Sequence, residues 1–162
     1  MDIDEARTRF SVLRAEDSTV PAGELDAVWA ALPAVRVEEI LGEWRGGEFT
    51  TGHPLNGMLR KAGWYGKTFL SAGDAKPLMM RGEDGRLYSD TRLGKGEASL
   101  WMVEFRGEST ATMVYDGQPV FDHFKAVDGH TLMGIMNRKG TGPDGPFYYF
   151  FLERADGDGT AS

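Results

Sequence analysis

The chain has 162 residues, 41% of them hydrophobic and 27% charged, which suits one domain with a real core and argues against disorder. A net charge of −7 disfavours binding to phosphate backbones and to anionic lipid surfaces. We therefore expect no nucleic-acid partner and no membrane insertion. The lack of cysteine excludes disulfides, thiol catalysis and thiolate metal ligands. No targeting segment or bilayer-length apolar run is visible, so the sequence predicts a soluble cytoplasmic protein.

Helical periodicity predicts two helices near the start of the chain, over Asp4–Leu13 and Gly23–Leu32. Pro33 ends the second helix, and one more helical turn is expected at Val37–Leu41. We expect this N-terminal segment, residues 1–41, to pack on the outside of the domain that follows it.

From residue 42 onward, short apolar and aromatic stretches are separated by glycine and aspartate, a pattern typical of antiparallel strands. A short helix is expected at Pro54–Ala62, because proline is favoured in the first turn of a helix. The predicted strands are Glu43–Thr51, Trp64–Ser71, Lys76–Arg81, Arg86–Asp90, Ala98–Arg106, Ser109–Tyr115, Val120–Val127, Thr131–Arg138 and Phe147–Arg154. This order predicts a mainly β fold: an up-and-down antiparallel barrel of about nine to ten strands over residues 42–155, then a flexible tail at 156–162.

Small barrels of this kind can enclose one apolar ligand, and the aromatic and methionine side chains of the predicted strands either line a cavity or fill a core. A bound carboxylate would need a basic or hydroxyl partner, since desolvating it alone is costly. Our first candidate for that partner is Arg138, followed by Tyr149, Lys67 and His123. The other candidate ligand-binding residues are Trp64, Trp101, Met136 and Phe121.

His123 has further interpretations if it points into the barrel together with Phe121. It could then be a polar anchor, a general base or the axial ligand of a haem, whereas the plainer alternative is a histidine bonded to a neighbour. The adjacent Asp122 suggests a base pair for an enzyme of unknown reaction. The three histidines match no zinc signature, so no metal site is predicted.

The segment Gly42-Glu43-Trp44-Arg45-Gly46 resembles the GXWXG-domain family, and the resemblance continues through Gly63–Lys67. Tyr115–Gly140 and the ending FYYFFLER resemble the domain of unknown function that usually follows the GXWXG domain. The first part covers about residues 37–95 and the second about 96–154. The resemblance implies a calycin-like barrel, akin to lipocalins, fatty-acid-binding proteins and nitrobindin, in which the motif residues Gly42, Trp44 and Gly46 are structural and the tryptophan packs across one end.

The first hypothesis is therefore a non-enzymatic barrel that binds a fatty acid or a similar amphiphile, with the Pro54–Ala62 helix as a lid. No cofactor is certain, and haem with His123 as its axial ligand is the first alternative. An enzyme that uses Asp122 and His123 is the second, and a homodimer stays open.

Overall fold

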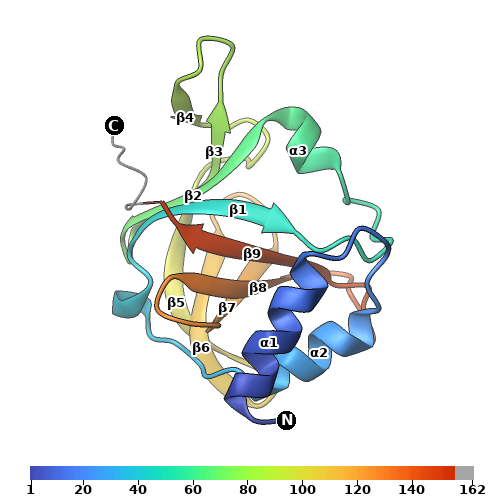
Figure 1. Cartoon of the computed structure of the whole chain (residues 1–162). Coiled ribbons are helices and arrows are strands. Elements are labelled where there is room, and N and C mark those ends of the chain that lie inside the picture. The colour runs from blue at the N-terminus through green and yellow to red at the C-terminus, as the bar shows by residue number, and fades with distance from the viewer. Residues whose placement is uncertain (156–162) are drawn as a thin grey trace.

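The computed structural model describes residues 1–155 of the chain, and the predicted tail at 156–162 lies outside the described residues (Figure 1). The helices are α1 (Ile3–Arg14), α2 (Ala22–Ala31), the short 3-10 helix η1 (Val37–Glu39) and α3 (Met58–Ala62). The strands are β1 (Gly42–Glu48), β2 (Trp64–Ser71), β3 (Asp74–Arg81), β4 (Leu87–Ser89), β5 (Ala98–Phe105), β6 (Glu108–Tyr115), β7 (Val120–Ala126), β8 (Thr131–Arg138) and β9 (Tyr148–Arg154).

Eight of these strands close into a barrel with antiparallel pairing throughout. In chain order β1, β2, β3, β5, β6, β7, β8 and β9 each pair with the next, and β9 pairs back with β1. The predicted up-and-down barrel is confirmed, as are the helices before it and the short helix between its first two strands.

The predicted strand at Arg86–Asp90 lies outside the closed barrel. It is β4, a three-residue strand that within the described residues pairs only with β3, in a hairpin that projects from the barrel (Figure 1). Leu87 and Tyr88 are exposed there, so no apolar face draws β4 into the barrel wall. The barrel therefore has eight strands rather than the nine to ten expected.

Two apolar layers share strands β8 and β9. One layer fills the barrel interior and includes Trp44, Phe124 and Phe150. The other lies outside, where α1 and α2 pack against the far face of β8 and β9 (Figure 1) and bury side chains such as Met133 and Ile135. Because both faces of β9 are covered, its sequence is apolar without alternation.

The GXWXG motif packs one part of the barrel wall around Trp44. This tryptophan is 1% exposed, its indole N–H donates to the Ile40 carbonyl at 2.9 Å, and the Arg154 guanidinium covers its ring. Gly42 has a φ of 130°, and a Cβ there would meet the same guanidinium. A Cβ on Gly46 would collide with the Trp64 ring, so glycine lets that ring lie on the strand.

The helix α3 is shorter than the predicted Pro54–Ala62 helix because it begins only at Met58. Residues 51–57 form a turn instead, in which the Asn56 side chain accepts hydrogen bonds from the Thr51 and His53 amides. Gly57, with a φ of 83°, separates this turn from the helix, and that left-handed conformation favours glycine. The short helix thus connects β1 to β2 across one end of the barrel.

Candidate functional site

An apolar cavity of about 290 Å³ opens at the end of the barrel beside α3. Neighbouring strands are antiparallel, so the end of β6, the start of β7, the end of β8 and the start of β9 meet at this end. The cavity is lined by Leu55, Met58, Leu59, Ala62, Leu78, Leu93, Tyr115, Gln118, Val120, Met136, Arg138 and Tyr148. We call it the mouth cavity.

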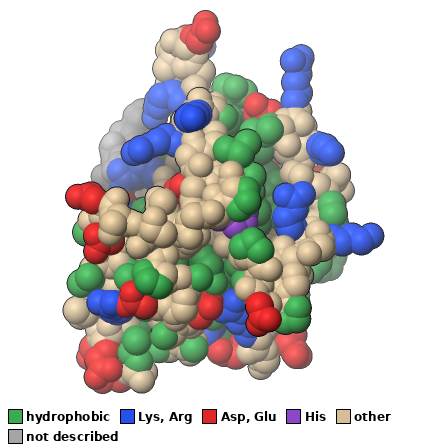
Figure 2. Space-filling model, turned by 90° about the vertical axis from the view of Figure 1, so that its right-hand side faces the viewer, with side chains coloured by type: hydrophobic (Ala, Val, Ile, Leu, Met, Phe, Trp, Pro, Cys, Tyr) green, Lys and Arg blue, Asp and Glu red, His purple; other side chains and the backbone are tan. Residues whose placement is uncertain are grey.

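The rim of the mouth cavity combines exposed apolar side chains with one basic side chain. Met58 on α3 and Leu93 on the β4–β5 connection are more than half exposed. Figure 2 looks onto the right-hand side of Figure 1, and there hydrophobic side chains follow a hollow in the middle of the face, with Lys and Arg side chains along one side. Arg138 is exposed at the end of β8, and among the described residues no carboxylate forms an ion pair with it.

Two tyrosines, Tyr115 and Tyr148, contribute hydroxyl groups to the lining of the mouth cavity. Tyr148 donates its hydroxyl to a Glu48 oxygen at 2.8 Å, whereas the Tyr115 hydroxyl has no hydrogen-bond partner within residues 1–155. Burial raises the pKa of both phenols, helped at Tyr115 by the charge of Asp122 and at Tyr148 by Glu48. Both hydroxyls therefore stay neutral and can donate as well as accept hydrogen bonds.

A buried ion pair between Lys67 and Asp122 lies in the barrel interior, and neither residue is part of the lining of the mouth cavity. The Lys67 ammonium is 3.0 Å from Asp122 Oδ2 and donates to the Pro77 carbonyl at 3.3 Å. It also lies within 6 Å of three ring centroids, at 5.5 Å for Trp64, 5.8 Å for Tyr115 and 5.3 Å for Phe150. The other oxygen of the carboxylate, Oδ1, is buried and has no hydrogen-bond partner among residues 1–155.

Burial governs the protonation of Asp122, because it raises the pKa of the carboxyl while the Lys67 charge opposes that change. The Lys67 and Asp122 side chains are thus enclosed by apolar and aromatic groups, which makes the unpartnered Oδ1 costly to bury.

The structure brings together four of the predicted ligand-binding residues. Lys67 and Trp64 lie in the barrel interior, Met136 lines the mouth cavity, and Arg138 stands at its rim. Alternation along β8 explains the last two, since Met136 and Arg138 are two residues apart and share one face of the strand.

The other four candidate ligand-binding residues do not point into the barrel, so the condition placed on Phe121 and His123 is not met. In β7 the inward positions are Asp122 and Phe124, so Phe121 and His123 face outward. Tyr149 belongs to the outer apolar layer beneath the helices. Trp101 is 60% exposed on the outside of β5.

His123 is buried between the outer barrel face and neighbouring side chains. Its ring stacks on Phe105 at 4.0 Å, and Nδ1 lies 2.8 Å from the Thr112 hydroxyl. Burial, with a smaller contribution from Arg106, lowers its pKa to about 4, so the imidazole is neutral. The haem alternative fails because this ring lies outside the barrel, and the paired-base alternative fails because Asp122 faces the opposite side of the strand.

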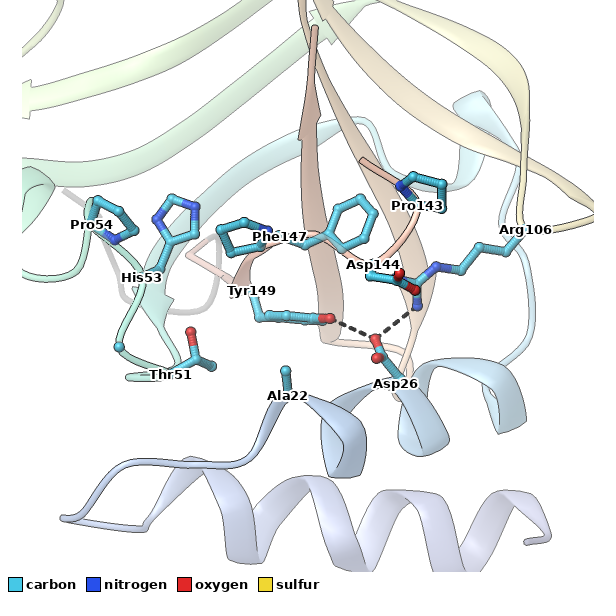
Figure 3. Close-up of a pocket in the computed structure, with 12 residues that line it drawn as sticks. Ala22, Asp26, Thr51, His53, Pro54, Arg106, Pro143, Asp144, Phe147 and Tyr149 are labelled. Atoms are coloured by element: carbon cyan, nitrogen blue, oxygen red, sulfur yellow. Dashed lines mark hydrogen bonds and ion pairs between the residues drawn. The ribbon is translucent and has the colours of Figure 1, made fainter. Parts of the chain in front are cut away.

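A second cavity of about 290 Å³ lies outside the barrel, between α2, the loop at residues 51–54 and the β8–β9 connection (Figure 3). At one end the Tyr149 hydroxyl donates to Asp26 at 2.6 Å and the Arg106 guanidinium reaches the same oxygen at 2.9 Å. Burial and then Asp26 raise the pKa of Tyr149 to about 12. His53 lines the other end, where its Nδ1 accepts the Leu55 amide at 3.0 Å. The Tyr149, Asp26 and Arg106 side chains satisfy one another and fasten α2 to the barrel.

The sequence pattern placed Tyr115 among the aromatic side chains that either line a cavity or fill a core, but it did not indicate Tyr148 as a cavity residue or the inward position of Asp122. The available signal was the hairpin at Asp116-Gly117, which places Tyr115 and Val120 at one end of adjacent strands.

No three His, Asp or Glu side chains in residues 1–155 gather in a way that could hold a metal ion. No helix in that range combines the length and apolarity needed to span a bilayer.

A closed antiparallel barrel with a helix beside an apolar mouth defines a calycin-like barrel protein. Residues 27–85 match the family described as GXWXG protein, and residues 96–154 match the domain of unknown function DUF4334; the chain belongs to this GXWXG and DUF4334 family. The crystal structure of a protein from Thermomonospora curvata is similar, with 38% identity and a TM-score of 0.82 over 93% of this chain and 98% of that chain. No curated protein matches the chain.

Proposed function

We propose that the protein binds a small amphiphile, a fatty acid or related lipid, in the mouth cavity. The observation that carries the proposal is an apolar cavity with an unpaired basic side chain, Arg138, at its rim. The apolar walls favour a hydrocarbon body and the guanidinium favours an anionic head group. A cytoplasmic location is part of the proposal, and the cysteine-free composition is compatible with it.

The size of the cavity favours a ligand with a medium-length chain over one with a long chain. Ligand cavities are commonly about 300–1,000 Å³, so about 290 Å³ is at the lower end of that range. Large interior side chains such as Trp44 and Phe124 fill the barrel beyond it. A medium-chain acid suits this volume, whereas a long chain would extend past the rim.

The helix α3 is suited to act as the lid. None of its residues is buried, and Gly57 and Gly63 stand at its two ends with φ values of 83° and 91°. Short elements with few buried contacts open at low cost in free energy, which would let a ligand enter.

Calorimetric titration with decanoic acid and with decanol tests the proposal. We expect both to bind the unchanged protein, and Met136→Trp, which fills the cavity, to weaken both by about tenfold or more. Met102→Trp is the matched control, because Met102 is partly exposed on β5 and lines no part of the mouth cavity. Binding that survives Met136→Trp, or no binding to the unchanged protein, would refute the proposal.

A further inference from the structure

Basic side chains stand around the mouth cavity on three separate segments of the chain. One segment is α3, the second is the β4–β5 connection and the third is the end of β8, and each has at least one residue in the cavity lining. We call the exposed basic residues of these segments the basic rim; they are Arg60, Lys61, Arg92, Lys95, Arg138 and Lys139. Residues 55–62, 91–96 and 138–141 contain no aspartate or glutamate. Asp90 and Asp116 adjoin these segments, so positive charge predominates around the cavity.

The basic rim differs from the other basic side chains of the protein because its charges have no internal counter-charge. Half of the 18 lysine and arginine side chains form an ion pair within residues 1–155, whereas none of the six rim side chains does. Like charges gathered on one face repel one another in the free protein. An anionic partner would offset that repulsion, so the charge of this face is complementary to an anionic surface.

Exposed apolar side chains lie inside the basic rim. Met58 is 57% exposed and Leu93 is 52% exposed, and both line the mouth cavity. Figure 2 shows hydrophobic side chains along the hollow in the middle of this face, Lys and Arg side chains beside them, and most acidic side chains in the lower half of the view. An acidic protein partner would account for the charges. A lipid surface accounts also for the apolar side chains, which can enter the headgroup region while the cations meet the lipid phosphates.

We infer that the mouth of the barrel docks on an anionic lipid surface, with the basic rim at the phosphates and Met58 and Leu93 among the headgroups. Docking would place α3 at that surface, and loading of the ligand from the bilayer is the part of this inference that rests on the proposed function. The net charge of −7 does not prevent docking. Charges farther off than a Debye length of about 8 Å are largely screened, so the local charge of the rim governs the contact.

Flotation with lipid vesicles tests the inference. One set of vesicles is phosphatidylcholine alone, and the other is phosphatidylcholine mixed equally with phosphatidylglycerol. We expect the protein to bind the mixed vesicles and not the neutral ones, and to bind less as the salt concentration rises. Replacing Arg92 and Lys95 together with glutamine should weaken this binding by about tenfold or more.

The matched control is Arg9→Gln combined with Arg36→Gln. It removes the same charge from α1 and from the start of η1, which lie away from α3 (Figure 1). Both arginines are exposed and form surface ion pairs, so their loss should change neither the fold nor vesicle binding appreciably.

The outcomes separate the docking surface from the proposed function. Equal binding to the two kinds of vesicle, no binding to either, or an equal loss in the two double variants would overturn the inference. Binding to polyglutamate without binding to the mixed vesicles would assign the basic rim to an acidic protein and overturn it as well. Decanoic acid should bind the variant of Arg92 and Lys95 as it binds the unchanged protein, because neither residue lines the cavity. Vesicle binding without decanoic acid binding would overturn the proposed function alone.

Discussion

Replacing Arg138 with methionine removes the rim charge and keeps a long apolar side chain. A buried charged hydrogen-bond partner would contribute about 2 kcal/mol or more to binding. Arg138 is exposed, however, so water screens its attraction for a carboxylate. We therefore expect Arg138→Met to weaken decanoic acid binding by about 1 kcal/mol, roughly fivefold, at low ionic strength.

The effect of Arg138→Met should depend on charge alone. Decanol has no charge and should bind Arg138→Met and the unchanged protein equally well. Lys139→Met is the matched control, because Lys139 is also exposed and adjacent in the chain but lines no part of the mouth cavity. Calorimetry at low and high salt gives the comparison, since salt should reduce the difference for the acid. Equal losses in Arg138→Met and Lys139→Met, or an equal loss for decanol, would refute the assignment of Arg138 as the anchor.

Three predictions concern stability and can be measured by urea unfolding. Trp44→Ala should cost about 3–5 kcal/mol, because a fully buried indole leaves a cavity; an unchanged unfolding midpoint would contradict its structural role. Tyr149→Phe should cost about 1–2 kcal/mol, since it deletes the bond to Asp26, whereas the exposed Tyr88→Phe should cost almost nothing. For His123 the folded pKa of about 4 lies below the ordinary 6.5, so protons bind the unfolded chain preferentially and stability falls as the pH drops from about 6.5 towards 4. The loss should reach about 2 kcal/mol near pH 5 and be absent from His123→Gln, and an identical pH profile in the two proteins would rule it out.

The barrel could be predicted from the sequence because its turns and strands are marked locally. Glycine and Asp-Gly pairs separate short apolar stretches, and antiparallel hairpins need little else. The predicted number of barrel strands was too high because it included the short hairpin strand β4. Its few apolar residues do not indicate whether the strand faces a core.

The inward face of β7 could not be predicted from the same signals. Apolar character favours Phe121 inside and Asp122 outside, which is the reverse of the structure. Two long-range facts decide the matter: Lys67, on a distant strand, pairs with Asp122 in the interior, and the outer face around His123 is itself buried. When both faces of a strand are covered, alternation no longer tells which face is the core.

The full set of residues that line the mouth cavity could not be predicted from the sequence for a related reason. Its lining residues Tyr115 and Tyr148 come from strands that are far apart in the chain and come together only when the barrel closes. Arg138 and Met136 could be predicted, because they alternate along one strand, β8, that ends at the mouth of the barrel.

Strands β1 and β9 join the GXWXG segment of the chain to the DUF4334 segment. Strand β1 belongs to the GXWXG segment and β9 to the segment that follows, and they are joined over five residue pairs. On the opposite side β3 and β5 share a single residue pair, Ala75 with Ala98. Each segment alone would be a curved open sheet with bare edges and half a core, so the two are halves of one folding unit. Expressed separately, they would have to find each other to fold, as complementing fragments do.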